Sequence, residues 1–292
     1  MASKLGAAIR RLLGGLWRVL SAPFRWLLRP LQPFLAEEPA YVPLSETVQK
    51  AVANPGDVLV HLAALRGHLV RSVIVLILAS LVAFEFAPQL LGWLAAPIGG
   101  LPALQAVDVT EPVGVVMRIT FFAAFVFSLP YIAFEALSFV APGLSRRSRL
   151  VGLIAIPLIL ILFACGALFT YYILLPPAVT FLVNFMEIPT QVRPSSYIGF
   201  ATGLMFWIGL AFELPLLSFV LAAIGLLPAR WLSANWRIAV VVLAIIAAAI
   251  TPTVDPINML LVWAPLVALY FLSVATALLA QRQRVRRRSQ DL

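Results

Sequence analysis

The sequence predicts an all-α, polytopic membrane protein with six transmembrane helices. The first observation is composition, because 62% of the 292 residues are hydrophobic, only 11% are charged and the mean hydropathy is +1.01. Soluble domains carry about a quarter charged residues, so this chain is expected to sit in a bilayer. Secondly, the apolar residues gather in runs close to the roughly 20 residues that a spanning helix needs. Thirdly, the basic residues lie almost entirely between and outside these runs.

Charge and hydropathy divide the chain into four regions. The first region repeats Arg11, Arg18 and Arg25 at seven-residue intervals, with Leu, Val and Trp between them. This pattern is typical of a basic amphipathic segment on a membrane surface, and a poorly ordered extension is the alternative. The expected regions are a basic amphipathic N-terminal segment (1–34), a cytoplasmic linker (35–56), a six-helix transmembrane domain (57–281) and a basic cytoplasmic tail (282–292).

Six apolar runs are the candidate crossings. They cover approximately residues 72–90, 113–139, 150–172, 198–227, 238–250 and 257–280. The fifth run holds 13 residues between Arg237 and Thr251. At about 1.5 Å per residue it is shorter than the hydrocarbon core, so we expect a short fifth helix. The loops 91–112 and 173–197 hold apolar stretches too short to cross, which indicates a structured outer cap.

The fourth run contains a single carboxylate, Glu213, followed two residues later by Pro215. Proline lacks an N–H and crowds the carbonyl four residues earlier, so the helix is expected to bend here. A carboxylate at this depth is costly unless it is hydrogen-bonded or faces water or a partner. Glu213 is therefore either a structural acceptor inside the bundle or a polar site in a cavity that partners use.

The basic residues predict the orientation in the membrane. Of the 21 Lys and Arg, all except Arg118 and Arg193 lie in segments that fall on one side of a chain with six crossings. Cytoplasmic segments carry the excess of Lys and Arg, so both termini are expected in the cytoplasm.

Composition also bears on function. One cysteine, Cys165, and two histidines, His61 and His68, are too few for a Cys/His metal cluster, and no glycine-rich nucleotide motif is present. We expect no enzymatic activity, no metal, no cofactor and no nucleic-acid partner. A small-molecule secondary transporter is an alternative, but it would be expected to show internal repeats, and none is evident between the two halves.

Four stretches of the chain resemble the TatC subunit of the twin-arginine protein translocase, in the order and spacing of that family. They are HLAALR (His61–Arg66), SLPYIAFEALSFVAPGLSRRSR (Ser128–Arg149), AFELP (Ala211–Pro215) and ITPTVDP (Ile250–Pro256). The resemblance covers about residues 57–280. It implies a cupped fold with short fifth and sixth helices, acting as signal-peptide receptor and core scaffold for the export of folded proteins, driven by the proton-motive force.

The resemblance also implies partners. These are TatA- and TatB-like single-span membrane proteins, the twin-arginine signal peptides of folded cargo, and further copies of the same chain in a homo-oligomer. Separately, the basic termini predict contacts with anionic lipids.

The family's acidic contacts for the arginine pair are missing from this chain. In the family two glutamates meet the pair, and the matching positions here hold Ala64 and Ser148. Guanidinium groups that leave water favour bidentate acidic partners. The chain is therefore either a receptor whose acidic contact has moved, or a divergent paralogue with altered or lost twin-arginine recognition.

Glu135, near the cytoplasmic end of the second crossing, is the candidate for the moved acidic contact. Its alternative role is an internal ion pair with Arg66 or Arg71, because a buried charge without a partner is costly. The expected signal-peptide site is Arg66, Glu135, Phe139 and Pro142. The resemblance further places Glu213 in a concave cavity, and it suggests Thr251, Asp255, Asn258 and Met259 as contacts for a partner's transmembrane helix.

Overall fold

The computed structural model describes residues 55–144, 146–184, 191–251 and 256–288. The expectations for the N-terminal segment 1–34, for nearly all of the 35–56 linker and for Asp255 lie outside the described residues.

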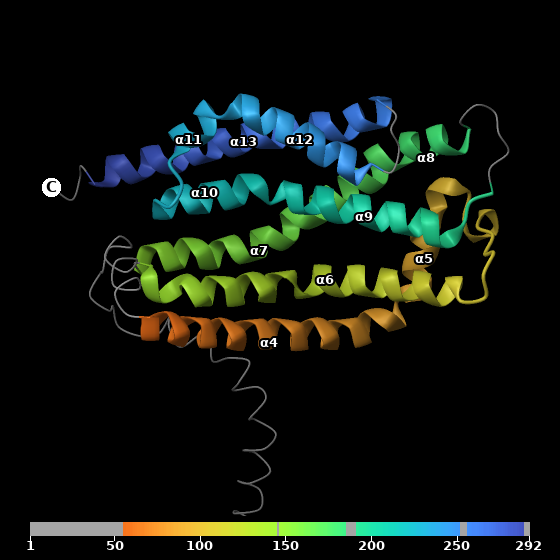
Figure 1. The fold of residues 1–292 in the computed structure, drawn as a ribbon, viewed down its shortest axis with the longest axis horizontal. Coiled ribbons are helices and arrows are strands. Elements are labelled where there is room, and N and C mark those ends of the chain that lie inside the picture. Colours follow the sequence, from red (N-terminus) through yellow and green to blue (C-terminus); the bar gives the residue numbers. More distant parts are fainter. Residues whose placement is uncertain (1–54, 145, 185–190, 252–255, 289–292) are drawn as a thin grey trace, which may run out of the picture. The chain divides into compact units, whose positions relative to one another are not determined.

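The described chain is helical apart from one isolated parallel bridge between Leu104 and Val192 (Figure 1). The longer α-helices are α4 (Pro55–Glu85), α6 (Glu111–Val140), α7 (Arg146–Phe169), α9 (Pro194–Phe212), α10 (Leu214–Ile224), α12 (Trp236–Ile250) and α13 (Pro256–Arg288). The shorter elements are α5 (Ala87–Ala95), α8 (Leu175–Val183), α11 (Ala229–Ala234), the 3-10 turns η2 (Ala96–Ile98), η3 (Leu101–Ala103) and η4 (Ala141–Gly143), and the π-helical turn η5 (Thr170–Leu174).

The fold class expected from the sequence is confirmed. Within the described residues, five helical stretches are long and apolar enough to cross a membrane. The short fifth helix is also confirmed, because α12 has 15 residues and is about 22 Å long, less than the roughly 30 Å of hydrocarbon.

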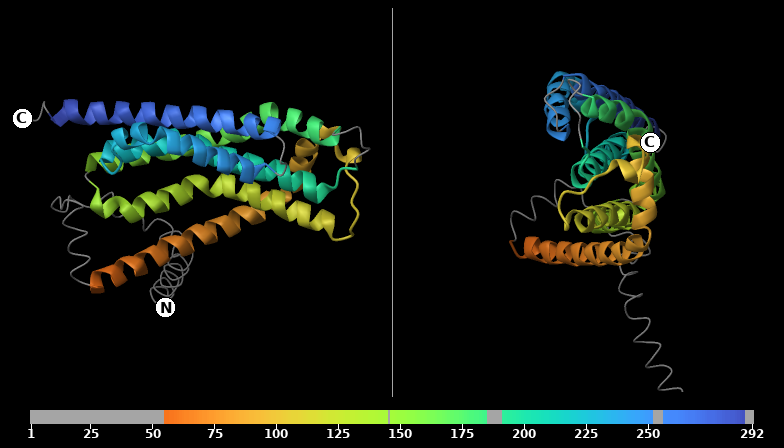
Figure 2. Two further views of the ribbon diagram at one scale, coloured as in Figure 1. Left: turned by 45° about the horizontal axis from the view of Figure 1, so that its top comes forward. Right: turned by 90° about the vertical axis from the view of Figure 1, so that its right-hand side faces the viewer.

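The expectation of a short sixth helix is wrong. Helix α13 has 33 residues and runs without interruption in Figure 2, although only Pro256–Arg282 is apolar enough to span. No proline or glycine follows Ala280, and the tail of Gln and Arg residues is a good helix former. The helix therefore continues beyond the apolar stretch into the basic tail.

The described helices form two compact units. Unit 1 contains residues 55–72 and Phe134–Arg149, and unit 2 contains Val73–Ala133 and residues 150–288. In unit 1, the turn η4 joins α6 to α7, and the buried side chain of Arg149 closes this turn. Its Nε donates to the carbonyl oxygens of Ala141, at 2.9 Å, and Leu144, at 3.1 Å.

The core of unit 2 depends on a close approach between α7 and α9. A Cβ on Gly166 would lie 2.9 Å from the Cα of Gly209 and 2.9 Å from the ring of Phe212, so a larger residue there would force the helices apart. The fully buried ring of Phe163 in turn occupies the space beside Gly209. Glycine at both positions therefore lets aromatic rings fill the gap between the two helices.

The fourth crossing is interrupted where the sequence predicts a bend. Helix α9 ends at Phe212 and α10 begins at Leu214, with Glu213 between them and Pro215 in the first turn of α10. Beyond the break, α10 lies alongside α13 (Figures 1 and 2). Thr276 Oγ1 donates to the Pro215 carbonyl at 2.8 Å, and Ser218 Oγ donates to the Ser273 carbonyl at 3.2 Å.

The described parts of the loops expected to form an outer cap, residues 91–112, 173–184 and 191–197, are structured. Helix α5 is tied to the rest of unit 2 by two tyrosines, because Tyr171 Oη donates to the Trp93 carbonyl at 2.7 Å and Tyr197 Oη donates to the Leu94 carbonyl at 2.6 Å. The Trp93 and Tyr171 rings stack with their centroids 3.9 Å apart. Both carbonyls belong to the last turn of α5, where the regular helical acceptor pattern ends; the Trp93 carbonyl also accepts from the Ala96 N–H.

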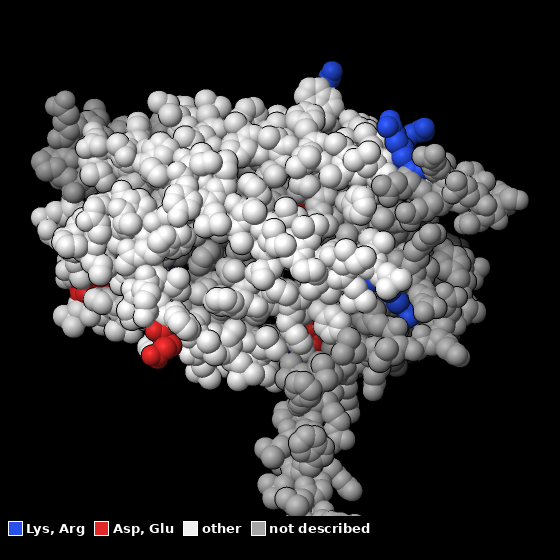
Figure 3. Space-filling model, turned by 180° about the vertical axis from the view of Figure 1, so that it is seen from behind, with Lys and Arg blue, Asp and Glu red and all other residues white. Residues whose placement is uncertain are grey.

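The surface suits contact with lipid. Figure 3 shows a face on which uncharged side chains dominate and charged ones occupy a few separate spots. Large apolar side chains reach the surface, among them Leu81 (69% exposed) and Ile154 (73% exposed). Exposed apolar area on this scale marks a membrane or protein interface rather than a water-facing surface.

Candidate functional site

A buried ion cluster lies in unit 1. Residues His68 and Arg71 are three apart on α4, which places them on one face of the helix, and both reach Glu135 of α6. Arg71 Nε donates to Glu135 Oε1 at 2.7 Å, and Arg71 Nη2 donates to Oε2 at 2.9 Å. The Glu135 side chain is 1% exposed. This bidentate pairing matches the planar fork of a guanidinium to the carboxylate.

His68 completes the cluster. Its Nδ1 lies 2.6 Å from Glu135 Oε2, which fits an Nδ1–H that donates to the carboxylate. The imidazole also meets the ring of Phe139 edge-on, with centroids 5.7 Å apart. His68 therefore connects the charged cluster to the aromatic residue that precedes the η4 turn.

The structure brings together part of the expected signal-peptide site. Glu135 pairs internally with Arg71, one of the two internal partners that the sequence left open, while Arg66 is exposed. Phe139 is half-buried beside His68, and Pro142 is exposed on the η4 turn. Both carboxylate oxygens of Glu135 are therefore already engaged within unit 1.

Glu213 lies at the break between α9 and α10 and is half-buried. Its Oε1 atom is buried and has no hydrogen-bond partner among the described residues. Buried polar atoms are nearly always paired, so this oxygen is an exception within the described fold.

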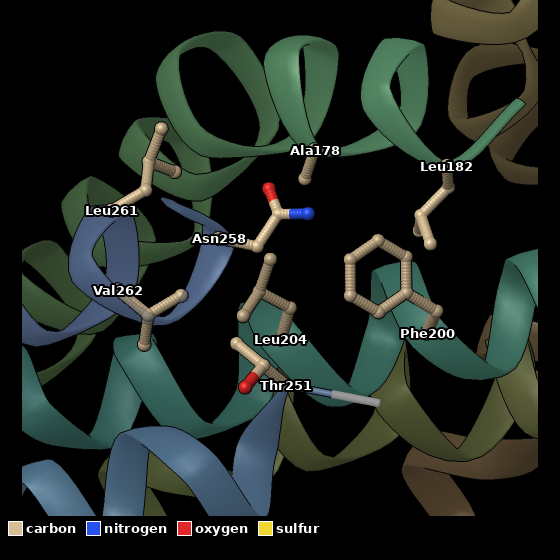
Figure 4. A pocket seen from close by; sticks show the side chains of 8 residues that line it. All are labelled: Ala178, Leu182, Phe200, Leu204, Thr251, Asn258, Leu261 and Val262. Carbon is tan, nitrogen blue, oxygen red and sulfur yellow. The ribbon is translucent and has the colours of Figure 1, made fainter. Parts of the chain in front are cut away.

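The residues expected to contact a partner helix lie close together in unit 2, where they are described. Thr251 and Asn258 are buried and line a small cavity with Leu204 and Phe200 of α9 (Figure 4). In that view the Asn258 amide points into the space between α8 and α9. The cavity has a free volume of about 10 Å³, room for roughly one water molecule. Met259 is half-buried, and Asp255 lies outside the described residues.

Sequence reasoning missed a second carboxylate cluster, in unit 2. Glu111, the first residue of α6, accepts through Oε1 from the Ser195 N–H at 3.0 Å and from the Ser195 hydroxyl. Its Oε2 accepts from the Val107 N–H at 3.1 Å, and Arg193 Nε lies 3.5 Å from Oε1. Glu111 and Ser195 are 84 residues apart, so no local pattern could have linked them.

The described residues contain no group of three His, Cys, Asp or Glu side chains placed to hold a metal ion. The carboxylates of Glu135 and Glu111 are held by cations, hydroxyl groups and backbone N–H groups. The membrane-length helices, one of them broken at a carboxylate, define a polytopic helical membrane protein.

Comparisons with known proteins identify the class more closely. The family model for the Sec-independent protein translocase protein TatC matches residues 60–265. The TatC protein of Campylobacter jejuni is 36% identical over 222 residues, covering 73% of this chain and 90% of that protein. TatC of Deinococcus radiodurans is 33% identical over 267 residues, covering 87% and 91%.

A solved structure agrees with these relatives. The "Crystal Structure of Twin Arginine Translocase Receptor- TatC" superposes with a TM-score of 0.66 at 30% identity, covering 75% of this chain and 99% of that one. The chain belongs to the TatC family, and it is a membrane component of the twin-arginine protein export system. The small-molecule transporter alternative gains no support from these comparisons.

Proposed function

We propose that this chain is the signal-peptide receptor and core scaffold of a twin-arginine translocase, and that unit 1 is where the signal peptide docks. Arg66, Glu135, Phe139 and Pro142 form the proposed contact region. In this proposal both termini face the cytoplasm, as the distribution of basic residues predicts. A solved relative at 30% identity is described as a twin-arginine translocase receptor, which supports the role.

The observation that carries the proposal is the locked turn at the end of α6. Two hydrogen bonds from the buried Arg149 hold η4 in place, and the turn presents Val140 (41% exposed) and Pro142 to the outside. Leu69 and Val70 of α4 add exposed apolar area in the same unit. A preformed apolar surface costs little ordering entropy on binding, which suits the apolar part of a signal peptide.

Electrostatics favour a second version of the function, a TatC-family subunit with altered or lost twin-arginine recognition. Ala64 and Ser148 stand where the family carries glutamates, and Glu135 is already bonded to Arg71 and His68. An incoming guanidinium could use Glu135 only by displacing Arg71. The free energy of that exchange is the difference between the free energies of two similar ion pairs, so the net gain for the signal peptide is small.

The remaining parts of the proposal concern assembly. Glu213, with an oxygen that has no donor among the described residues, is the proposed polar site for a visiting transmembrane helix. Thr251, Asp255, Asn258 and Met259 are the proposed contact for TatA- or TatB-like single-span partners. We further propose a homo-oligomer, anionic lipids at the basic termini and transport driven by the proton-motive force.

Complementation of a bacterial strain that lacks its own TatC tests the two versions. The strain would express the full chain with a folded reporter whose signal peptide carries paired arginines, beside a matched reporter with paired lysines. We expect export of the arginine reporter alone if the ordinary specificity survives. Export of neither or both reporters, with the chain present in the membrane at normal levels, would contradict ordinary recognition and support the divergent version.

A further inference from the structure

An arginine without an acidic partner lies on a membrane-spanning helix. Arg118 is on α6, seven residues after Glu111 and inside the candidate span Glu111–Val140, and its side chain is exposed. Within the described residues, Arg118 makes no ion pair or hydrogen bond. A charged side chain within a span costs several kcal/mol unless it reaches a partner or the interface, so its surroundings decide what it does.

The guanidinium of Arg118 lies against the neighbouring helix α9 at Gly199; this contact is called the seat of Arg118. A Cβ on Gly199 would overlap Arg118 Nη1, so the guanidinium rests against the bare glycine and would have to shift if Gly199 carried a side chain. Gly114, one turn before Arg118, and Gly203, one turn after Gly199, both border open space, with nothing within 4 Å of an added Cβ. The Arg118 guanidinium therefore lies between two glycines, Gly114 and Gly203, that have open space beside them.

The depth of this seat corresponds to a lipid headgroup. At about 1.5 Å per residue, the Cα of Arg118 lies about 10 Å along α6 from Glu111, and Gly199 lies about 9 Å along α9 from Arg193. Helical side chains lean toward the helix N-terminus, and long basic ones extend their charge toward the interface. The polar groups of Glu111, Arg193 and Ser195 mark that interface.

We propose that Arg118, seated on Gly199, binds the phosphodiester group of a phospholipid in the leaflet on the Glu111 side. The guanidinium fork matches two phosphate oxygens, and the open position at Gly114, toward the Glu111 end of α6, leaves room for a headgroup. A second transmembrane helix fits this place less well. Gly199 is covered by the guanidinium, so α9 does not present the continuous bare glycine face on which helices pack closely.

Lipid titration of the purified full chain in detergent, followed by native mass spectrometry, tests this proposal. The probe is phosphatidylglycerol, and the variants are Arg118→Gln, Arg118→Lys and Gly199→Ala, with Arg230→Gln as the control at another exposed arginine. We expect Arg118→Gln to raise the apparent dissociation constant of the tightest lipid about fivefold, the contribution of one basic residue near a membrane surface. Arg230→Gln should change it less than twofold.

The remaining variants separate charge from geometry. Arg118→Lys keeps the charge without the fork and should weaken binding by a smaller factor. Gly199→Ala keeps the arginine but forces its guanidinium to shift, and it should weaken binding by less than Arg118→Gln. Equal lipid binding by Arg118→Gln and Arg230→Gln would overturn the proposal. So would displacement of the lipid by inorganic phosphate, or photocrosslinks from position 118 that capture protein rather than lipid.

Discussion

Two buried carboxylates on the same helix are held in opposite ways. Glu135, near the end of α6, is 1% exposed and bound by the guanidinium of Arg71 and the imidazole of His68. Glu111, at the start of α6, is 7% exposed and held mainly by the neutral donors of Ser195 and Val107. The first arrangement places a guanidinium and a carboxylate together out of water, whereas the second stabilises one carboxylate through hydrogen bonds from N–H and O–H groups. Removal of one partner should therefore be far more costly at Glu135.

The largest effect is expected from Glu135→Ala. This change leaves Arg71 buried beside His68 without its carboxylate, and breaking such a pair costs about 3–5 kcal/mol. Thermal unfolding of the purified protein in detergent measures the loss. The double variant Arg71→Leu with Glu135→Leu is the control, because it removes both charges and should recover most of the stability. A wild-type unfolding midpoint for Glu135→Ala would show that the cluster contributes nothing to the fold.

A smaller loss is expected from Ser195→Ala. The change deletes the hydroxyl donor to Glu111 but keeps the Ser195 and Val107 N–H groups, so the carboxylate retains two of its bonds. The unfolding midpoint should fall by less than in Glu135→Ala. Ser196→Ala, at the exposed neighbouring serine, is the matched control and should leave the midpoint unchanged. An equal fall for Ser195→Ala and Glu135→Ala would erase the distinction between the two clusters.

The smallest effect is expected from Arg193→Gln. The Arg193 side chain is 49% exposed and its Nε lies 3.5 Å from Glu111 Oε1, so solvent screens the pair. The unfolding midpoint should not change measurably, in either low or high salt. A fall as large as that of Ser195→Ala would mean that Arg193, rather than the neutral donors, holds Glu111.

Much of the fold could be predicted because it depends on local composition. Apolar runs identified the crossings, Pro215 identified the break at Glu213, and the short run after Arg237 identified the short α12. The length of α13 was wrong because hydropathy marks where lipid ends, whereas a helix ends where its backbone is interrupted. The basic tail of α13 contains neither proline nor glycine.

The candidate site was predictable only in part. The pairing of Glu135 with Arg71 was one of two alternatives, because both Arg66 and Arg71 precede the first crossing; the rotation of α4 decided between them. His68 was not foreseen as a partner, although it shares a helix face with Arg71. The Glu111 cluster and the seat of Arg118 on Gly199 join residues distant in the chain, and no periodic pattern in a single sequence reports such contacts.

The break at Glu213 divides the fourth crossing into two helices that are held by different contacts. Before it, α9 is wedged against α7 by facing glycines; after it, α10 is fastened to α13 through Thr276 and Ser218. The crossing is therefore held as two parts, α9 through α7 and α10 through α13, with Glu213 at the junction between them.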